Sequence, residues 1–205
     1  MLLHTKKPGK IRLVWDAAAN VNGISLNSVL LPGPDLLTSL PAVLFRFRQF
    51  PVAVSSDIKE MFHQILITES DRHSQRFLWR HSPDQNPNIF LMDVLTFGAT
   101  SSPVSAQFTK NKIALEFVDR CPRAVEGILK SHYVDDYLDS FETVGEAKIV
   151  SSEVKTIHSA GGFELHNWLS NRPEVLEHLG VAASNLPKQL TSLKDSDTER
   201  VLGML

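Results

Sequence analysis

The sequence predicts an α+β fold in which antiparallel strand hairpins pack against helices. Short β-rich runs and apolar helical runs follow one another irregularly, and two of the β-rich runs, Ile128–Val134 and Tyr137–Phe141, lie close enough along the chain to form a hairpin. A doubly wound parallel sheet would instead alternate strands and helices regularly. The 205 residues show no internal repeat, which argues against a solenoid.

The first third of the chain is expected to hold two strands separated by a loop and a helix. Ile11–Trp15 is typical of a short strand, and the stretch Asn20–Pro34, rich in Asn, Gly, Ser and Pro, is typical of a connection. Asp35 is expected to be the N-cap of the apolar helix that follows. Pro51–Ser55 then forms a buried strand that delivers Asp57 at its end.

The middle of the chain is expected to contribute strands and one long helix. Three β-rich runs are predicted as strands: Ile65–Ile67, Arg76–Trp79 and Ile89–Leu95. The segment Ser82–Asn88 carries two prolines and is predicted as a loop. Ser102 as a cap, with Pro103 at the first helical position, predicts a helix that runs to about Val118.

The last third begins with the predicted hairpin, whose strands leave Asp135 and Asp136 at the tip. A helix is predicted over Glu146–Ala160, because Gly161 and Gly162 follow it as a stop signal. Phe163–Leu169 alternates between apolar and polar residues and is predicted as the last strand.

The composition indicates an ordinary globular protein and excludes several classes. Hydrophobic residues make up 42% and charged residues 21% of the chain, which excludes a disordered or collagen-like protein. The single Cys121 excludes an internal disulfide and a Cys-rich zinc site, and it favours a reducing compartment. The longest uncharged stretch, Ala17–Pro34, is too polar to cross a membrane. A formal charge of −2 argues against nucleic-acid binding through bulk charge.

The most informative segment places the carboxylates Asp135 and Asp136 together at the hairpin tip. An isolated Asp-Asp pair is more often a plain turn, but here a predicted strand and a tyrosine lie on each side, and Asp57 ends another apolar strand. Carboxylates brought together repel one another and need cations, of which Mg²⁺ with its preference for oxygen ligands is the most suitable. A pair of such ions about 3.5–4 Å apart can activate a hydroxyl and stabilise a leaving pyrophosphate.

Three motifs, found in the family's order, resemble those of reverse transcriptases. The run Asp57–Ile65 is similar to the first palm motif, in which an aromatic residue follows the aspartate by five positions. Phe97–Pro103, together with Gln107, resembles the motif that opens the template-positioning helix, and Tyr133–Asp136 resembles the Tyr-x-Asp-Asp catalytic box.

Further segments look like the BEL/Pao class of long-terminal-repeat retrotransposons: Lys7–Arg12, Ser25–Asn27, Gly33–Leu37, Arg76–Arg80 and Gly161–Leu165. The resemblance covers Lys6 to Asn171. It implies the fingers and palm of a right-handed polymerase, with an antiparallel four-stranded palm sheet backed by helices. Residues 1–50 and 65–95 would form the fingers, and residues 51–64 and 96–205 the palm. Val201–Leu205 looks like the start of a primer grip, so a thumb is expected to be absent.

The resemblance also implies the residues of a metal site. Asp57 and Asp135 would bind two Mg²⁺ ions, for which Mn²⁺ could substitute, and Asp136 would be a supporting catalytic carboxylate. Ile58 would lend its backbone carbonyl to the nucleotide-bound ion.

Four residues are expected to contact the incoming nucleotide. Arg12 would clamp its triphosphate, Phe62 would exclude a ribose 2′-OH, and Gly98 and Gln107 would line the nucleotide site. Without the resemblance, Arg12 would be read as a solvated side chain, Phe62 as a core residue and Gln107 as an exposed polar residue of its helix.

Two departures from the family pattern affect the expected site. Phe97 stands where retroviral enzymes carry Gln, which removes a polar contact to the nucleotide. Asn167 stands where the class often has a basic residue, so the proton donor to pyrophosphate is in question, with His166 as a substitute.

The implied function is that of an RNA-directed DNA polymerase core from a retrotransposon. Its partners would be an RNA or DNA template with its primer, deoxynucleoside triphosphates and other domains of the retroelement polyprotein, without a membrane. The expected location is intracellular, in a cytoplasmic retroelement particle with access to the nucleus. Two alternatives stay open: a catalytically weak or inactive retroelement remnant that acts at most as a nucleic-acid-binding module, and a metal-dependent phosphohydrolase that uses the same carboxylates.

Overall fold

The computed structural model describes residues 2–7 and 10–181, and these form two compact units. The first unit comprises residues 1–35 and 60–106, and the second comprises residues 36–59 and 107–205. Each unit is described by itself below. The expected primer-grip segment Val201–Leu205 lies outside the described residues.

The second unit is built on a four-stranded antiparallel sheet with the strand order β6-β7-β3-β8. The strands are β3 (Val52–Ile58), β6 (His132–Tyr133), β7 (Asp136–Phe141) and β8 (Leu165–Ser170). β3 lies between β7 and β8, so the two longest ladders of the sheet both run along it. This arrangement confirms the predicted mixture of helices with an antiparallel sheet.

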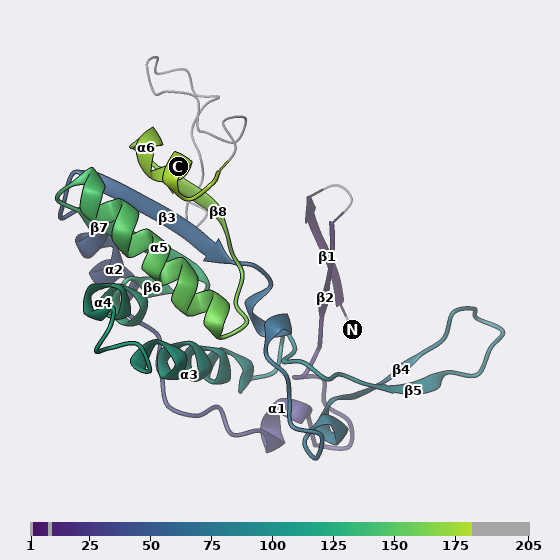
Figure 1. Ribbon diagram of the computed structural model, residues 1–205. Coiled ribbons are helices and arrows are strands. Elements are labelled where there is room, and N and C mark those ends of the chain that lie inside the picture. Colours follow the sequence, from purple (N-terminus) through teal and green to yellow (C-terminus); the bar gives the residue numbers. More distant parts are fainter. Residues whose placement is uncertain (1, 8–9, 182–205) are drawn as a thin grey trace. The chain divides into compact units, whose positions relative to one another are not determined.

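Helix α5 (Val144–Ala160) lies across one face of this sheet and contacts β3, β7 and β8 (Figure 1). Helix α4 (Pro122–Lys130) packs on α5 and β6, and helix α6 (Pro173–His178) packs on α5 and β8. Helix α2 (Leu40–Phe47) contacts β6 and β7. The core between these elements consists of buried apolar side chains: Val54, Ile58, Tyr137, Phe141, Val154, Ile157 and Trp168.

Local sequence explains where α5 begins and ends. The hydroxyl of Thr143 accepts a hydrogen bond from the backbone N–H of Glu146 at 3.1 Å, which satisfies one free donor of the first turn. The helix ends at Ala160, and Gly162 follows with a φ of +78°, a conformation that glycine adopts without strain. The predicted helix over Glu146–Ala160 is confirmed, with its start two residues earlier.

The first unit contains two antiparallel strand pairs and short helices. β1 (Leu2–Lys7) pairs with β2 (Lys10–Val14), and β4 (Arg76–Trp79) pairs with β5 (Asn88–Leu91). The short elements are α1 (Leu26–Val29), η1 (Met61–Gln64) and η2 (Arg72–Gln75). Helix α3 (Ser102–Leu115) begins in this unit and continues into the second. The predicted strand at 76–79 is confirmed, and the predicted strand at 11–15 and loop at 82–88 are confirmed to within one residue.

An aromatic row holds the β4–β5 ribbon in the first unit. The ring of Phe77 packs edge-on against Trp15, with centroids 4.8 Å apart, and stacks on Phe90 at 5.6 Å. A two-stranded ribbon is marginally stable alone, so these ring contacts supply much of its support.

Two predicted elements are wrong. Asp35 does not cap a helix: α2 begins at Leu40 after Ser39, because Pro41 fits only the first turn and would break a helix that started at 36. The strand predicted over 128–134 is reduced to the two residues of β6, because Pro122 starts α4 and carries the chain as a helix to Lys130.

Two further strand predictions are too long. Residues 65–67 form only an isolated bridge between Leu66 and Val94, and β5 ends at Leu91 rather than at Leu95.

Residues 36–50, which were expected in the fingers, belong to the second unit together with the sheet. The labels fingers and palm themselves stay predictions.

Among the described residues, none of the helices is both long enough and apolar enough to cross a membrane.

A buried basic cluster lies in the second unit beside α5. His132 and His158 are buried with ring centroids 5.1 Å apart, and the ammonium group of buried Lys110 donates to the carbonyl of Ile128 at 3.2 Å. Burial lowers the pKa of His132 well below 6.5, that of His158 to about 4 and that of Lys110 to about 7. The two histidines are therefore neutral in the folded protein at neutral pH.

We predict that the free energy of unfolding falls as the pH drops below 6.5. Unfolded histidines bind protons near pH 6.5, whereas folded His158 stays neutral down to about pH 4, so the unfolded state binds more protons within this window. The expected loss between pH 7 and pH 5 is on the order of 1–2 kcal/mol for His158, and His132 adds a loss in the same direction. Urea unfolding at both pH values measures it. His158→Leu should lose less stability on acidification than the parent chain, and exposed His81→Leu should behave as the parent; equal pH dependence in all three would contradict the assignment.

Candidate active site

Four polar residues form a row across the sheet of the second unit. Asp57 on β3 is paired with Asp136 on β7 and with His166 on β8, and Asp136 is paired in turn with Tyr133 on β6. Directly opposed residues of neighbouring strands point to the same face of a sheet. The row therefore brings two of the three predicted catalytic carboxylates together at one end of β3.

The third predicted carboxylate, Asp135, belongs to the two-residue loop between β6 and β7. Its backbone carbonyl accepts a hydrogen bond from the N–H of Ile58 at 2.9 Å, which ties the loop to the end of β3. Val134, the other loop residue, has a φ of +56°, an unfavourable value for a β-branched side chain. Backbone strain of this kind persists only where surrounding contacts impose it.

Gln107 supplies one of those contacts. Its side chain is buried, and its amide nitrogen donates to the carbonyl of Val134 at 2.9 Å. The structure thus places Gln107 of α3 against the two-residue loop between β6 and β7. This residue was expected to contact the nucleotide; that role stays a prediction, and the hydrogen bond to the loop is an additional one that the sequence did not indicate.

The carboxylates influence one another electrostatically. The pKa of Asp136 is raised from 3.8 to about 6, mainly because the side chain is partly buried and also because the negative charges of Asp135 and Asp57 lie nearby. At neutral pH the three charges are therefore held together at a cost, which a cation placed among them would relieve.

Asp57 is held from the β8 side. The amide nitrogen of Asn167 donates to its Oδ1 at 2.9 Å, and Nδ1 of His166 lies 3.1 Å from its backbone carbonyl and 3.4 Å from its Oδ2. One residue further along, Lys59 pairs with Glu164 at 2.9 Å. These contacts join the ends of β3 and β8, and no spacing in the sequence pointed to them.

The three carboxylates suit Mg²⁺ as part of an open site that other ligands complete. In the described part of the chain, no three His, Cys, Asp or Glu side chains are grouped so that they could hold a metal ion by themselves. Mg²⁺ is commonly bound through one or two carboxylates, with water and substrate phosphate completing its coordination. Asp57, Asp135 and Asp136 fit this open type of site rather than a closed protein cage.

The other predicted nucleotide contacts, Arg12, Phe62 and Gly98, lie in the first unit. Arg12 is on β2, paired with His4. Phe62 is half-buried on η1, and its ring packs edge-on against Phe97 with centroids 4.8 Å apart. The nucleotide-binding roles of these residues stay predictions.

Gly98 has a clear packing reason to be glycine. Its φ is +103°, and a Cβ at this position would collide with the carbonyl oxygen of Trp15. The side chain of Asn27 fixes the same turn by donating to the Gly98 carbonyl at 3.1 Å and accepting from the Thr100 N–H at 2.8 Å.

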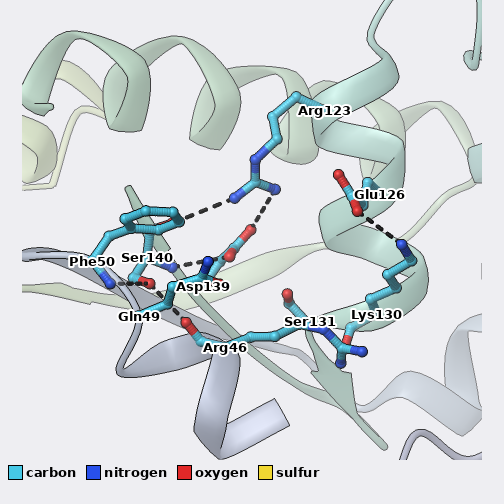
Figure 2. A pocket seen from close by; sticks show the side chains of 9 residues that line it. All are labelled: Arg46, Gln49, Phe50, Arg123, Glu126, Lys130, Ser131, Asp139 and Ser140. Carbon is cyan, nitrogen blue, oxygen red and sulfur yellow. Dashed lines mark hydrogen bonds and ion pairs between the residues drawn. The ribbon is translucent and has the colours of Figure 1, made fainter. Parts of the chain in front are cut away.

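A separate hollow of about 250 Å³ lies between α2, α4 and β7 (Figure 2). Its charged groups pair with one another: Arg123 with Asp139 at 2.9 Å, and Lys130 with Glu126 at 2.8 Å. Arg46 donates to the carbonyl of Lys130 at 2.7 Å and so caps the end of α4. These contacts explain the hollow as a polar junction that joins two helices to the sheet.

Comparison with known proteins places the fold. One similar solved structure is that of a foamy viral protease-reverse transcriptase in complex with double-stranded DNA: the TM-score is 0.58 and the identity 20%, over 80% of this chain and 25% of that one. Another is the foamy viral protease-reverse transcriptase in complex with an RNA/DNA hybrid, with a TM-score of 0.48 and 19% identity over 63% of this chain and 15% of that one.

The first of these likenesses shows a reverse-transcriptase-like fold. The chain spans about a quarter of the length of that viral protein. No family model matches the chain, and no curated protein does.

We predict that Asp136→Asn stabilises the protein at pH 7.5. The folded pKa of Asp136 is about 6 against 3.8 for an ordinary aspartate, so folding opposes its ionisation above pH 6, and the amide removes that opposition. Because the side chain is partly exposed, the expected gain is only on the order of 1 kcal/mol. The gain should shrink as the pH falls from 6 toward 3.8 and vanish only at about pH 2.5, where the carboxyl group is protonated in both the folded and the unfolded state. Urea unfolding at pH 7.5 and at pH 2.5 tests this, with Asp84→Asn in an exposed loop as the control.

Proposed function

We propose that this chain is the core of an RNA-directed DNA polymerase from a BEL/Pao-type retrotransposon. In this function a primer 3′-hydroxyl attacks the α-phosphate of a deoxynucleoside triphosphate on an RNA or DNA template, and pyrophosphate leaves. The observation that carries the proposal is the meeting of Asp57, Asp135 and Asp136 at one end of the antiparallel sheet. The reverse-transcriptase-like fold supports it.

The carboxylates would act by holding divalent cations. Asp57 and Asp135 are the proposed ligands of two Mg²⁺ ions, the carbonyl of Ile58 is a proposed further ligand, and Asp136 adds negative charge beside them. Bound there, the ions would supply Lewis-acid stabilisation of the charge on the entering and leaving oxygens. The pKa of Asp136 is raised mainly by burial, but the negative charges of Asp135 and Asp57 add to the rise, and charge concentrated in this way supports binding of a cation.

The fixed geometry of the loop between β6 and β7 supports a role in positioning the Asp135 carboxylate. The hydrogen bonds from Gln107 to Val134 and from Ile58 to Asp135 hold both loop residues by their backbone carbonyls. A carboxylate on a rigid loop loses little freedom when it binds an ion, which favours catalysis by preorganisation.

The proposed nucleotide contacts come from the first unit. Arg12 would bind the triphosphate, since a guanidinium can donate two parallel hydrogen bonds to phosphate oxygens. Gly98 would contribute a backbone surface free of side chain, and Phe62 would leave no room for a ribose 2′-hydroxyl.

The first test is primer extension. The parent chain should add deoxynucleotides to a DNA primer on a poly(rA) template with Mg²⁺, and Asp135→Asn should reduce the rate at least 100-fold, because the amide carries no charge to hold the ion. Asp84→Asn, an equivalent change in the exposed loop, should leave the rate unchanged.

The same experiment separates the alternatives. Template binding with no extension by either form would favour a nucleic-acid-binding remnant. Release of phosphate from a nucleotide without primer, lost in Asp135→Asn, would favour a phosphohydrolase. Equal incorporation by the parent and Asp135→Asn would refute the polymerase assignment.

A second test concerns sugar selection. Phe62→Val should raise the incorporation of ribonucleotides relative to deoxynucleotides about 10- to 100-fold, since removal of the ring makes room for the 2′-hydroxyl. Competition between the two nucleotides in the extension assay measures the ratio. Phe108→Val, which removes an exposed ring from α3, is the matched control. If Phe62 serves only to pack against Phe97, the variant will lose stability while the ratio stays the same.

A further inference from the structure

The pairing between β3 and β8 is irregular beside Asp57. The register of the two strands shifts between Ser55 and Asp57. On the opposite strand Asn167 has a φ of +51°, although it lies inside β8. A left-handed residue in a strand is costly for most side chains and is tolerated best by glycine and asparagine. Irregularities of this kind redirect one side chain out of the normal alternation.

The redirected side chain is that of Asn167, and it reaches the candidate metal site. A regular strand would send residues 166 and 167 to opposite faces of the sheet. Here His166 and Asn167 both contact Asp57: Nδ1 of His166 is 3.1 Å from its carbonyl oxygen, and Nδ2 of Asn167 is 2.9 Å from its Oδ1. The local distortion of β8 therefore brings two consecutive side chains onto one aspartate.

The contact restricts the Asp57 carboxylate. The hydrogen bond from Asn167 to Oδ1 favours one orientation of the side chain, and the neighbouring ring of His166, 3.4 Å from Oδ2, closes the same flank. On its other flank Asp57 is paired with Asp136, whose negative charge repels it. A hydrogen bond from one flank against repulsion from the other leaves Asp57 little freedom to turn away.

The chemical type of the donor also matters. An amide N–H satisfies a carboxylate oxygen without adding a fixed positive charge. A lysine or arginine in the same place would orient the carboxylate equally well but would compete with a divalent cation for its charge. Asparagine thus orients Asp57 and leaves its charge available.

We propose that Asn167 is a positioning residue that presets the Asp57 carboxylate for a divalent cation, through the hydrogen bond that the left-handed backbone of β8 makes geometrically accessible. The inference deepens the proposed function and rests on it for the identity of the cation site. It assigns to Asn167 a role that its place in a strand does not suggest.

The decisive variant is Asn167→Gly. Glycine adopts a φ of +51° without strain, so this change removes the amide and keeps the backbone. Alanine would add strain and confuse the result. The chain offers a matched control in Asn22→Gly: Asn22 has a φ of +53° and lies in the first unit.

The measurement is Mn²⁺ binding to the full chain, followed by the loss of the free-ion signal in electron paramagnetic resonance. Asn167→Gly is expected to bind Mn²⁺ about 10-fold more weakly, the lower end of the usual effect of removing a hydrogen-bond partner of a metal ligand. Asn22→Gly should match the parent, and Asp57→Asn should bind far more weakly than either. Thermal melts should show that all three variants fold.

The outcomes separate this inference from the polymerase proposal. Unchanged Mn²⁺ affinity in folded Asn167→Gly, or no Mn²⁺ binding by the parent chain, overturns the inference whatever the extension assay shows. Weakened affinity in Asn167→Gly together with the absence of extension by the parent supports the inference and counts against the polymerase. Weakened affinity with normal extension by the parent supports both.

Discussion

The candidate site of the second unit depends on one unfavourable pairing, that of Asp57 with Asp136 across β3 and β7. Two carboxylates opposed on neighbouring strands repel each other, and such pairs destabilise a sheet. The pKa of Asp136 is raised first by burial, and the charges of Asp135 and Asp57 add to the rise. The pairing persists because the rest of the ladder holds it in place: β3 pairs with β7 at six positions from Val52 to Asp57, and most of those side chains are buried. The buried side chains of β3 and β7 fix the register of the two strands, and this register places Asp57 opposite Asp136.

A second aspartate on the same strand shows what the protein does with a carboxylate that is structural. Asp139 lies three residues after Asp136, so strand alternation sends it to the opposite face, under helix α4. There it is buried, and it accepts hydrogen bonds from Arg123 and from the hydroxyl of Tyr137. Its charge is compensated inside the protein. Asp57 and Asp136 face the other way, where Asn167 and His166 of β8 contact Asp57.

Much of this arrangement could be predicted from the sequence, and the failures have physical causes. Local patterns predicted the hairpin with Asp135 and Asp136 at its tip and the apolar strand before Asp57. The meeting of Asp57 with these two residues was predicted only by the resemblance to reverse transcriptases. The strand predicted over 128–134 was wrong because Ile128 and Leu129 suit either type of element. Pro122, six residues before Ile128, starts helix α4, and the salt bridge between Glu126 and Lys130 further stabilises this helix. The contact between Asn167 and Asp57 joins residues 110 positions apart, so local patterns could not reveal it.

Two backbone distortions, the positive φ angles of Val134 and Asn167, lie at one end of the sheet. Val134 and Asn167 are two non-glycine residues with positive φ, and both lie next to the carboxylates. In a regular sheet, residue 167 would turn away from Asp57, and a hairpin loop of this kind would usually carry a glycine in place of Val134. Each departure costs stability, and each is held by a hydrogen bond, from Gln107 in one case and to Asp57 in the other. Within the strands of this sheet and the loop between β6 and β7, the non-glycine residues with positive φ are Val134 and Asn167. Because both lie beside the carboxylates, their strain is more simply explained by the requirements of that group than by those of folding.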